Sequence, residues 1–335
     1  MKTPIARTLS FKPSERNVFF HLLTGCNLAC RHCYINPEQH GTGMVSRETM
    51  LAWLELFAAP EKETNLVFLG GEPTLHPDLA EGIKAAGKLG YSSVTVDTNG
   101  YLFHNLLEKI SPQEAVLSFS LDGPTPEVND PIRGSGVFAA CSANLKRAVA
   151  KGFTVSVIYT VSRLNLEALK EMPALLSDWG VHRFFIQVIG IRGKPAADGG
   201  DLQLTPEEWL GVVPAVAREA ARRGLHVIYP KVFLEGDEPF ECAGRVAENY
   251  FIFPNGRVYC CPLCEDFPVH TYRIEDNRLV KNAGLIEEKF FTLQIPEGCV
   301  MNKLLQPGNI CYDAQGQPLS RISCCLLKQE MTIGG

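Results

Sequence analysis

Three closely spaced cysteines are the residues of this chain best suited to chemistry. Cys26, Cys30 and Cys33 have the spacing C-x3-C-x2-C and follow an apolar run, NVFFHLLT (17–24), that predicts a β-strand. They therefore belong on the loop at the carboxyl end of that strand, the edge where parallel α/β sheets and barrels build active sites. Thiolates select zinc or iron-sulfur clusters, and three of them leave one coordination position open. The spacing predicts a metal site at which a reacting molecule can bind.

The remaining cysteines lie far along the chain. Of the twelve cysteines, Cys141 stands alone and eight lie from Cys242 onward. Such a count would indicate disulfides in a short secreted protein, but this chain has 335 residues and its first 17 residues lack the apolar core of a signal peptide. The uneven distribution therefore predicts two separate metal sites.

Composition excludes several classes of protein. Apolar residues make up 45% of the chain and charged residues 21%, as in folded globular proteins. The 32 Lys and Arg are outnumbered by 37 Asp and Glu and form no basic stripe, which argues against nucleic-acid binding. No apolar run approaches the roughly 20 residues that span a bilayer. We expect a cytoplasmic protein that binds neither nucleic acid nor membrane.

Short β-rich runs alternate with segments of helical period from residue 17 to about residue 190. Six strands separated by helices predict a parallel sheet with right-handed crossovers, either doubly wound or rolled into a barrel. Several strands are apolar on both faces, as strands covered by helices must be. The predicted strands are 17–24, 65–70, 92–98, 115–121, 154–161 and 182–190, and the predicted helices between them are 46–59, 77–90, 103–110, 137–152 and 165–180.

The pattern changes in the last third of the chain. The polar stretch 192–204 is a candidate linker or lid, and Thr205 with Pro206 predicts the start of a further helix. Hairpin signals then replace helical ones, most clearly at Asn255-Gly256. The predicted organisation is an N-terminal extension (1–16), a core domain (17–235) and a small cysteine-rich domain (236–335).

The C-x3-C-x2-C motif, together with GGEP (70–73) at the end of the second strand, resembles the radical S-adenosylmethionine (SAM) superfamily. Alone, the cysteine spacing also fits half of a zinc knuckle. The resemblance implies that the three cysteines hold a 4Fe-4S cluster and that SAM chelates the fourth iron. It implies reductive cleavage of SAM to methionine and a 5'-deoxyadenosyl radical, which abstracts hydrogen from a substrate. The implied fold is a partial (β/α)6 TIM-type barrel.

The resemblance also implies a SAM pocket at the strand ends. The glycine-rich turn would meet the amino group of SAM, and Ser120 and Asp122 would lie near its ribose or carboxylate. His32 falls where the family usually has an aromatic residue beside the adenine. The strand ends near Thr160 and Gln187 would complete the ring. The implied cofactor-binding residues are His32, Gly70, Gly71, Glu72, Thr98, Asn99, Ser120, Asp122 and Arg133.

The segment CAGRVAENYFIFPNGRVYCCPLC resembles the start of the auxiliary-cluster domains called SPASM and twitch. Its hairpin would bring Cys242 to Cys260 or Cys261, which point to opposite faces of a strand. The resemblance implies one auxiliary 4Fe-4S cluster, because Cys299, Cys311 and the last cysteine pair do not match a full SPASM motif. A structural zinc is the alternative. The implied ligands are Cys242, Cys261 or Cys260, Cys264, and Cys324 or its neighbour Cys325.

The leading hypothesis is a radical SAM oxidoreductase or maturase that acts on a peptide or a small metabolite, with flavodoxin or ferredoxin as electron donor. Sixteen residues before the first strand are too few for a leader-peptide-binding domain, so a peptide substrate would need a partner protein or another binding mode. The tail MTIGG resembles that of GTP 3',8-cyclase, but CAGRVAEN keeps only Arg245 of the arginines expected there. The third hypothesis is a non-catalytic iron-sulfur or zinc protein.

Overall fold

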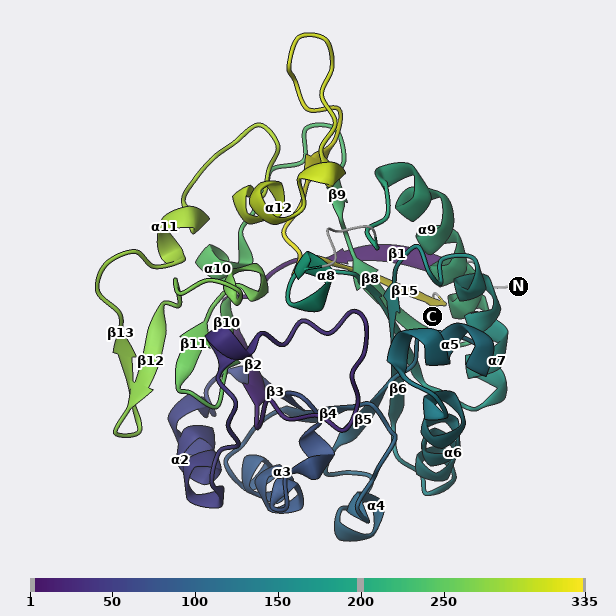
Figure 1. The fold of residues 1–335 in the computed structure, drawn as a ribbon, viewed down its shortest axis with the longest axis vertical. Helices are drawn as coiled ribbons and strands as arrows, with labels where there is room; N and C mark the ends of the chain where they lie inside the picture. Colours follow the sequence, from purple (N-terminus) through teal and green to yellow (C-terminus); the bar gives the residue numbers. More distant parts are fainter. Residues whose placement is uncertain (1–3, 198–201, 334–335) are drawn as a thin grey trace.

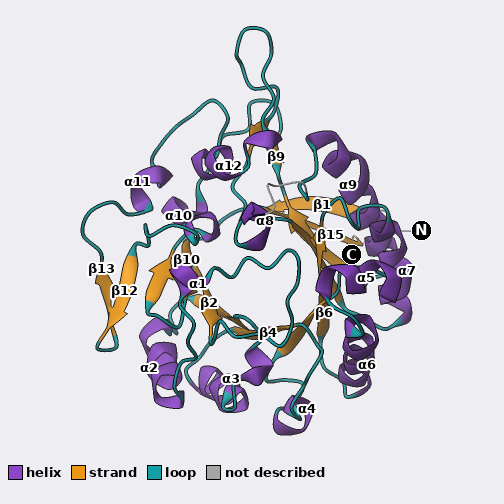
Figure 2. Ribbon diagram, viewed as in Figure 1, coloured by secondary structure: helices purple, strands orange, loops and turns teal. Residues whose placement is uncertain are grey.

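The computed structural model describes residues 4–197 and 202–333. Its centre is a run of parallel strands in sequence order, β2 to β8, with β10 parallel to β2 on the other side. These strands curve into an open ring (Figures 1 and 2). The predicted partial TIM-type barrel is confirmed. Its strands are β2 (Glu15–His21), β3 (Glu63–Leu69), β4 (Ser93–Thr98), β5 (Val116–Ser120), β6 (Val155–Val161), β7 (Arg183–Val188), β8 (His226–Pro230) and β10 (Glu248–Ile252).

Antiparallel strands extend the sheet at both edges. One edge carries β15 and then β1, and the other carries the meander from β11 to β13. A separate pair, β9 and β14, lies beside the last helices. The bounds are β1 (Pro4–Leu9), β9 (Phe233–Leu234), β11 (Arg257–Tyr259), β12 (Tyr272–Glu275), β13 (Arg278–Lys281), β14 (Arg321–Ile322) and β15 (Lys328–Ile333).

The longer helices cover the outside of the ring (Figure 2). Their starts follow the sequence signals: Ser46 caps α2 by accepting from the Thr49 amide, and Thr205 with Glu208 forms a capping box on α9. The helices are α1 (Pro37–His40), α2 (Arg47–Phe57), α3 (Leu79–Lys88), α4 (Leu106–Lys109), α5 (Pro126–Arg133), α6 (Val137–Ala150), α7 (Met172–Asp178), α8 (Lys194–Ala197), α9 (Pro206–Arg222), α10 (Ala243–Val246), α11 (Glu288–Phe291) and α12 (Val300–Leu305). Short 3-10 turns are η1 (Pro73–Leu75), η2 (Ala168–Glu171), η3 (Pro262–Cys264) and η4 (Pro307–Asn309).

The two ends of the chain join the barrel sheet. The segment 1–16, predicted as an extension, contains β1, which pairs along its whole length with β15. The sheet is also continuous across residue 235, because β10 continues it beside β2 and β15 continues it beside β8. The strands of the cysteine-rich segment therefore continue the barrel sheet, except β14, which pairs with β9.

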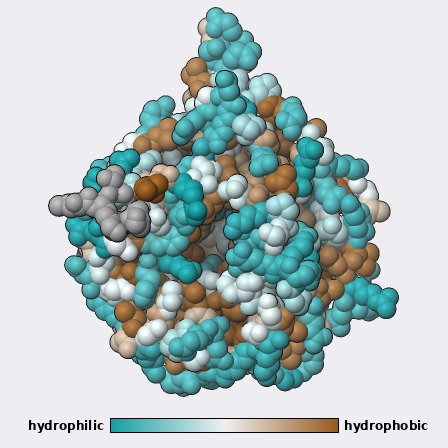
Figure 3. All heavy atoms as spheres, turned by 180° about the vertical axis from the view of Figure 1, so that it is seen from behind, coloured by the Kyte–Doolittle hydropathy of each residue, from teal (hydrophilic) through white to brown (hydrophobic). Residues whose placement is uncertain are grey.

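Two apolar cores support these elements. The larger one lies between the barrel strands and the outer helices, and a smaller one around Phe253, Tyr259 and Leu263 holds several cysteines. On the rear face, hydrophilic and hydrophobic residues are interspersed (Figure 3). None of the helices in the described part of the chain is long and apolar enough to cross a membrane.

Candidate metal centres

The first cysteine loop (residues 22–36) leaves β2 and spans the middle of the ring (Figure 1). The GGEP turn holds its start in place. The Gly71 amide donates to the Leu23 carbonyl at 2.8 Å, and the Glu72 amide donates to the Gly25 carbonyl at 3.1 Å. A Cβ at Gly70 would lie 2.2 Å from the Leu23 oxygen, and one at Gly71 would lie 2.0 Å from the Gly25 oxygen. These glycines are required because backbone packs on backbone here.

The three thiols of this loop interact with one another and are free of disulfides. Burial, together with smaller contributions from Glu72 and the other two thiols, raises the pKa of Cys26 to about 11. Burial also raises the pKa of Cys30, whose thiol lies 3.8 Å from the Arg133 carbonyl oxygen. Uncharged thiols in this setting become good ligands only when a cation stabilises the thiolates.

The carboxylate of Glu72 joins the ends of β3 and β4, because both of its oxygens accept hydrogen bonds there. Its Oε1 accepts from the Thr74 hydroxyl and amide, at 2.6 and 3.0 Å, and from the Thr98 hydroxyl at 2.8 Å. Its Oε2 accepts from the Asn99 amide at 2.7 Å. Burial raises the pKa of Glu72, and these donors oppose that shift. The carboxylate therefore fixes the position of Asn99.

Asp122 plays a similar part between β5, β6 and the cysteine loop. Its side chain is fully buried. Its Oδ1 accepts from the Thr160 amide at 2.7 Å, while its Oδ2 lies 2.6 Å from Arg133 Nε and 3.2 Å from His32 Nε2. Burial is the main reason that the pKa of His32 falls to about 4, so its ring is neutral at pH 7. The other ring nitrogen, Nδ1, is buried without a hydrogen-bond partner.

Several polar atoms around the loop have space for a polar ligand. Within the described residues, Asn27 Nδ2, His32 Nδ1 and Gln187 Oε1 are buried without a hydrogen-bond partner. The Asn99 side-chain amide donates to Asn27 Oδ1 at 2.8 Å and lies 3.7 Å from the Cys26 sulfur. Ser120 ends β5, where strand alternation places its side chain on the same face as Ser118. Three free thiols beside unpaired donors and acceptors fit a cluster with a polar ligand on its open position.

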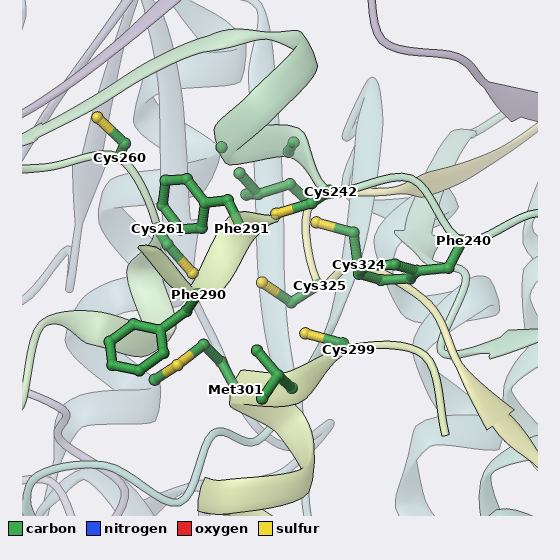
Figure 4. Close-up of a pocket in the computed structure, with 14 residues that line it drawn as sticks. Phe240, Cys242, Cys260, Cys261, Phe290, Phe291, Cys299, Met301, Cys324 and Cys325 are labelled. Atoms are coloured by element: carbon green, nitrogen blue, oxygen red, sulfur yellow. The ribbon is translucent and has the colours of Figure 1, made fainter. Parts of the chain in front are cut away.

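The second group of thiols meets at the edge of the barrel that carries β10 and β11. The thiol of Cys261 lies near those of Cys264 and Cys325, and the thiol of Cys325 lies near that of Cys324. One pocket is lined by the thiols of Cys242, Cys261, Cys299, Cys324 and Cys325, while Cys260 lies at its edge and points away (Figure 4). No three His, Cys, Asp or Glu side chains of the described chain are arranged to hold a single metal ion. With Cys264, six thiols gather here, more than the four that a tetrahedral zinc takes.

A buried glutamate organises this second site. Glu287 is fully buried, and its carboxylate accepts from the amides of Cys260 and Cys261 at 2.7 and 3.0 Å. It also accepts from the amide and hydroxyl of Thr271, at 3.2 and 3.0 Å. Burial raises the pKa of Glu287 to about 7, and the four donors oppose that shift. Glu287 thereby fixes the end of β11 from which the thiols project.

Comparison with known proteins decides the family. The Radical SAM superfamily profile matches residues 21–176. A "Probable GTP 3',8-cyclase" of Saccharolobus islandicus is 30% identical over 253 residues, covering 72% of this chain and 80% of that protein. The chain belongs to the radical SAM superfamily. It is therefore an enzyme that uses a 4Fe-4S cluster and SAM.

Two other similar proteins match over more of the chain. "Mycofactocin maturase MftC" of Mycobacterium ulcerans is 29% identical over 300 residues, covering 80% of this chain and 75% of that protein. The structure of Streptococcus suis SuiB bound to its precursor peptide SuiA has a TM-score of 0.68 at 16% identity and covers 91% of this chain and 73% of SuiB. At that identity the likeness concerns the fold alone.

The structure places the predicted radical SAM site residues as follows. All nine predicted cofactor-binding residues lie at the carboxyl ends of β2 to β5 or on the segments that contact the cysteine loop. Of the four predicted ligands of the second site, Cys242, Cys261 and Cys324 line one pocket, and Cys264 lies near Cys261. Sequence reasoning missed Cys299, which the fold brings to the same pocket. Cys311 is exposed, on the protruding loop between η4 and β14 (Figure 1).

The described part of the chain ends with β15, just before the glycine tail. Gly334 and Gly335 lie outside the described residues. Ile333 pairs with Pro4, and β15 runs antiparallel to β8, so its end lies at the amino edge of the barrel strands. The first cysteine loop lies at the opposite, carboxyl edge.

Proposed function

We propose that this radical SAM enzyme modifies a peptide. The observation that carries this proposal is the 29% identity with MftC, named as a maturase, over 80% of this chain, because the match extends beyond the barrel. The fold shared with SuiB, solved with its precursor peptide, also supports it. A GTP 3',8-cyclase activity is less well supported, because only Arg245 of the expected arginines is present.

Cys26, Cys30 and Cys33 are the proposed ligands of the first cluster. When bound, the cluster and SAM supply a 5'-deoxyadenosyl radical that abstracts hydrogen from the substrate. Gly70 and Gly71 hold the start of the cysteine loop, which their lack of a side chain permits. Contact of the same turn with the amino group of SAM stays part of the proposal.

The proposed SAM pocket is formed by side chains that buried carboxylates position. Glu72 holds Thr98 and Asn99, and Asp122 holds His32 and Arg133. His32 Nδ1 is an acceptor suited to the amino group of adenine, and the unpaired Asn27 Nδ2 is a donor suited to a carboxylate or ribose oxygen. Ser120 completes the pocket at the end of β5.

The proposed second site holds an auxiliary iron-sulfur cluster. Its ligands come from Cys242, Cys261, Cys264, Cys299 and the Cys324-Cys325 pair, a thiolate set that suits an iron-sulfur cluster. Flavodoxin or ferredoxin is the proposed electron donor. Cys26 is exposed, so the first site is open to such a donor from the barrel mouth.

Hydrogen transfer from a peptide tests this proposal. Peptides encoded by neighbouring genes would be synthesised with deuterium at each side chain in turn and incubated with the reduced enzyme and SAM. Mass spectrometry should find deuterium in 5'-deoxyadenosine for one labelled position. SAM cleavage that never acquires deuterium from any such peptide would contradict a peptide substrate while leaving the radical SAM assignment intact.

A further inference from the structure

A three-residue segment after β7 touches both cysteine sites. Arg192, Gly193 and Lys194, here called the bridge segment, begin the stretch that the sequence predicted as a linker or lid. Instead of standing free, these residues lie between the first cysteine loop and the segment 261–266 of the second site.

Arg192 anchors the bridge segment to the second site. Its Nη1 donates to the Pro262 carbonyl and pairs with the carboxylate of Glu265, which is only 2% exposed. On its other side the guanidinium lies 5.1 Å from the ring centre of Tyr34, the residue after Cys33. One buried cation therefore contacts the residues adjoining a cysteine of each site.

Gly193 and Lys194 complete the connection. The Gly193 amide donates to Asp266 at 2.9 Å, while the Lys194 amide donates to the Cys33 carbonyl at 3.0 Å and its Nζ to the Cys30 carbonyl at 3.1 Å. Gly193 has φ +58°, and a Cβ there would lie 2.6 Å from the Cys33 oxygen. The contact is so close that only glycine fits.

Additional contacts join the same two segments. Asn36 donates to Asp266 at 3.3 Å, and the His40 ring lies 3.2 Å from the Glu265 carbonyl oxygen. These bonds hold the far end of the first loop. Among the described residues outside the cysteine loop, only those of the bridge segment donate to the carbonyl oxygens of Cys30 and Cys33.

We propose that the bridge segment sets the position of the first cysteine loop against the second site, so that the state of the second site changes SAM binding at the first. This inference rests on the proposed assignment of the two cysteine sites. Arg192, Gly193 and Lys194 act as positioning residues, because they contact ligand-bearing backbone and no reacting atom. Coupling through packed, hydrogen-bonded segments commonly changes the affinity of a distant site by about fivefold or more.

A double-mutant cycle tests the coupling. SAM dissociation constants and the SAM-induced change in the electron paramagnetic resonance spectrum would be measured on reduced holoenzyme for wild type, Cys264→Ala, Arg192→Met and the double variant. Cys264→Ala should weaken SAM binding by about tenfold in the wild-type background and by under about twofold when Met replaces Arg192. Iron analysis of each variant reports whether each site is filled.

Variants of the other two bridge residues separate an effect on SAM binding from a loss of folding. Lys194→Met changes an exposed side chain that contacts only the first loop, and it should weaken SAM binding while iron content and thermal unfolding stay as in wild type. Gly193→Ala is the harsher variant, because its Cβ would meet the Cys33 carbonyl oxygen, and it should weaken SAM binding more strongly and also lower thermal stability. Two matched controls should change neither SAM binding nor iron content. They are Gly211→Ala, on an open part of α9, and Arg147→Met, at the surface.

The outcomes separate the two proposals. The coupling would be overturned if Cys264→Ala weakened SAM binding equally in the wild-type and Arg192→Met backgrounds. It would also be overturned if all bridge variants bound SAM as wild type does. Either result would leave the cluster assignments standing. Full iron content in Cys264→Ala would instead contradict the ligand assignment of the second site, and with it the route by which that site acts on the first.

Discussion

Gly71 lies so close to Gly25 that a Cβ at position 71 would be 2.0 Å from the Gly25 carbonyl oxygen. Gly25 directly precedes the first cysteine of the cluster loop. The GGEP turn is thus the support on which that loop rests, and the shape of the turn determines where Cys26 begins.

Gly71→Ala should displace the cysteine loop and remove the first cluster. Because the Cβ meets backbone, which cannot move aside cheaply, we expect a loss of about four irons per chain and loss of SAM binding. Gly87→Ala is the matched control, since a Cβ at that helix position meets nothing within 4 Å. Iron analysis and titration with SAM check the pair, and a Gly71→Ala protein with full iron content and normal SAM affinity would contradict the account.

Asp122→Asn should leave Arg133 buried without a counter-ion. Breaking a buried pair typically costs about 3 kcal/mol of unfolding free energy, and we expect SAM binding to weaken as well because the carboxylate beside His32 becomes an uncharged amide. The control Glu108→Gln removes a carboxylate from an exposed pair with Arg147 and should cost under about 1 kcal/mol. Urea unfolding of both variants gives the comparison, and similar small losses would argue against a positioning role for Asp122.

Glu287→Gln should disturb the second site alone. The amide keeps the shape of the carboxylate but replaces an acceptor with a donor facing the amides of Cys260 and Cys261. We expect reduced iron at the second site, measured in a background with Cys26, Cys30 and Cys33 changed to Ala. Glu288→Gln alters the exposed neighbour, which pairs with Lys281, and should retain that iron. Zinc in place of iron would show that the second site is a zinc site.

Asp97 should make stability depend on pH. Burial raises the pKa of Asp97 to about 7, while its pKa in the unfolded chain is about 3.9. Between these values the folded protein binds more protons than the unfolded chain, so this group's contribution to stability falls as pH rises through 7.

Asp97→Asn removes this dependence, so the variant should gain stability relative to wild type as pH rises. Thermal unfolding of both proteins from about pH 5.5 to 8.5 measures the difference. A difference that stays constant over this range would show that Asp97 does not titrate there.

The sequence was most informative where structure is local. The six central strands were predictable because each is a short β-rich run, and the starts of α2 and α9 because Ser46 and Thr205 carry capping signals. Strand β1 was missed because its residues are mostly exposed and their pattern indicates no partner, although β15 supplies one.

The site was predictable to the extent that its residues adjoin a motif. The roles of Glu72 and Asp122 could not be read from their positions, because their partners come from other strands and from α5. Cys299 could not be grouped with Cys242 from spacing, since only the three-dimensional course of the chain brings them to one pocket. Glu287 had no sequence signal at all.

Formation of 5'-deoxyadenosine tests the central claim most directly. Protein purified without oxygen and reduced with dithionite should convert SAM to 5'-deoxyadenosine and methionine, as detected by mass spectrometry. The variant Cys30→Ala should lose this activity along with its first-site iron, while the second-site iron is retained. Wild-type protein that holds its first cluster but forms no 5'-deoxyadenosine would contradict the account.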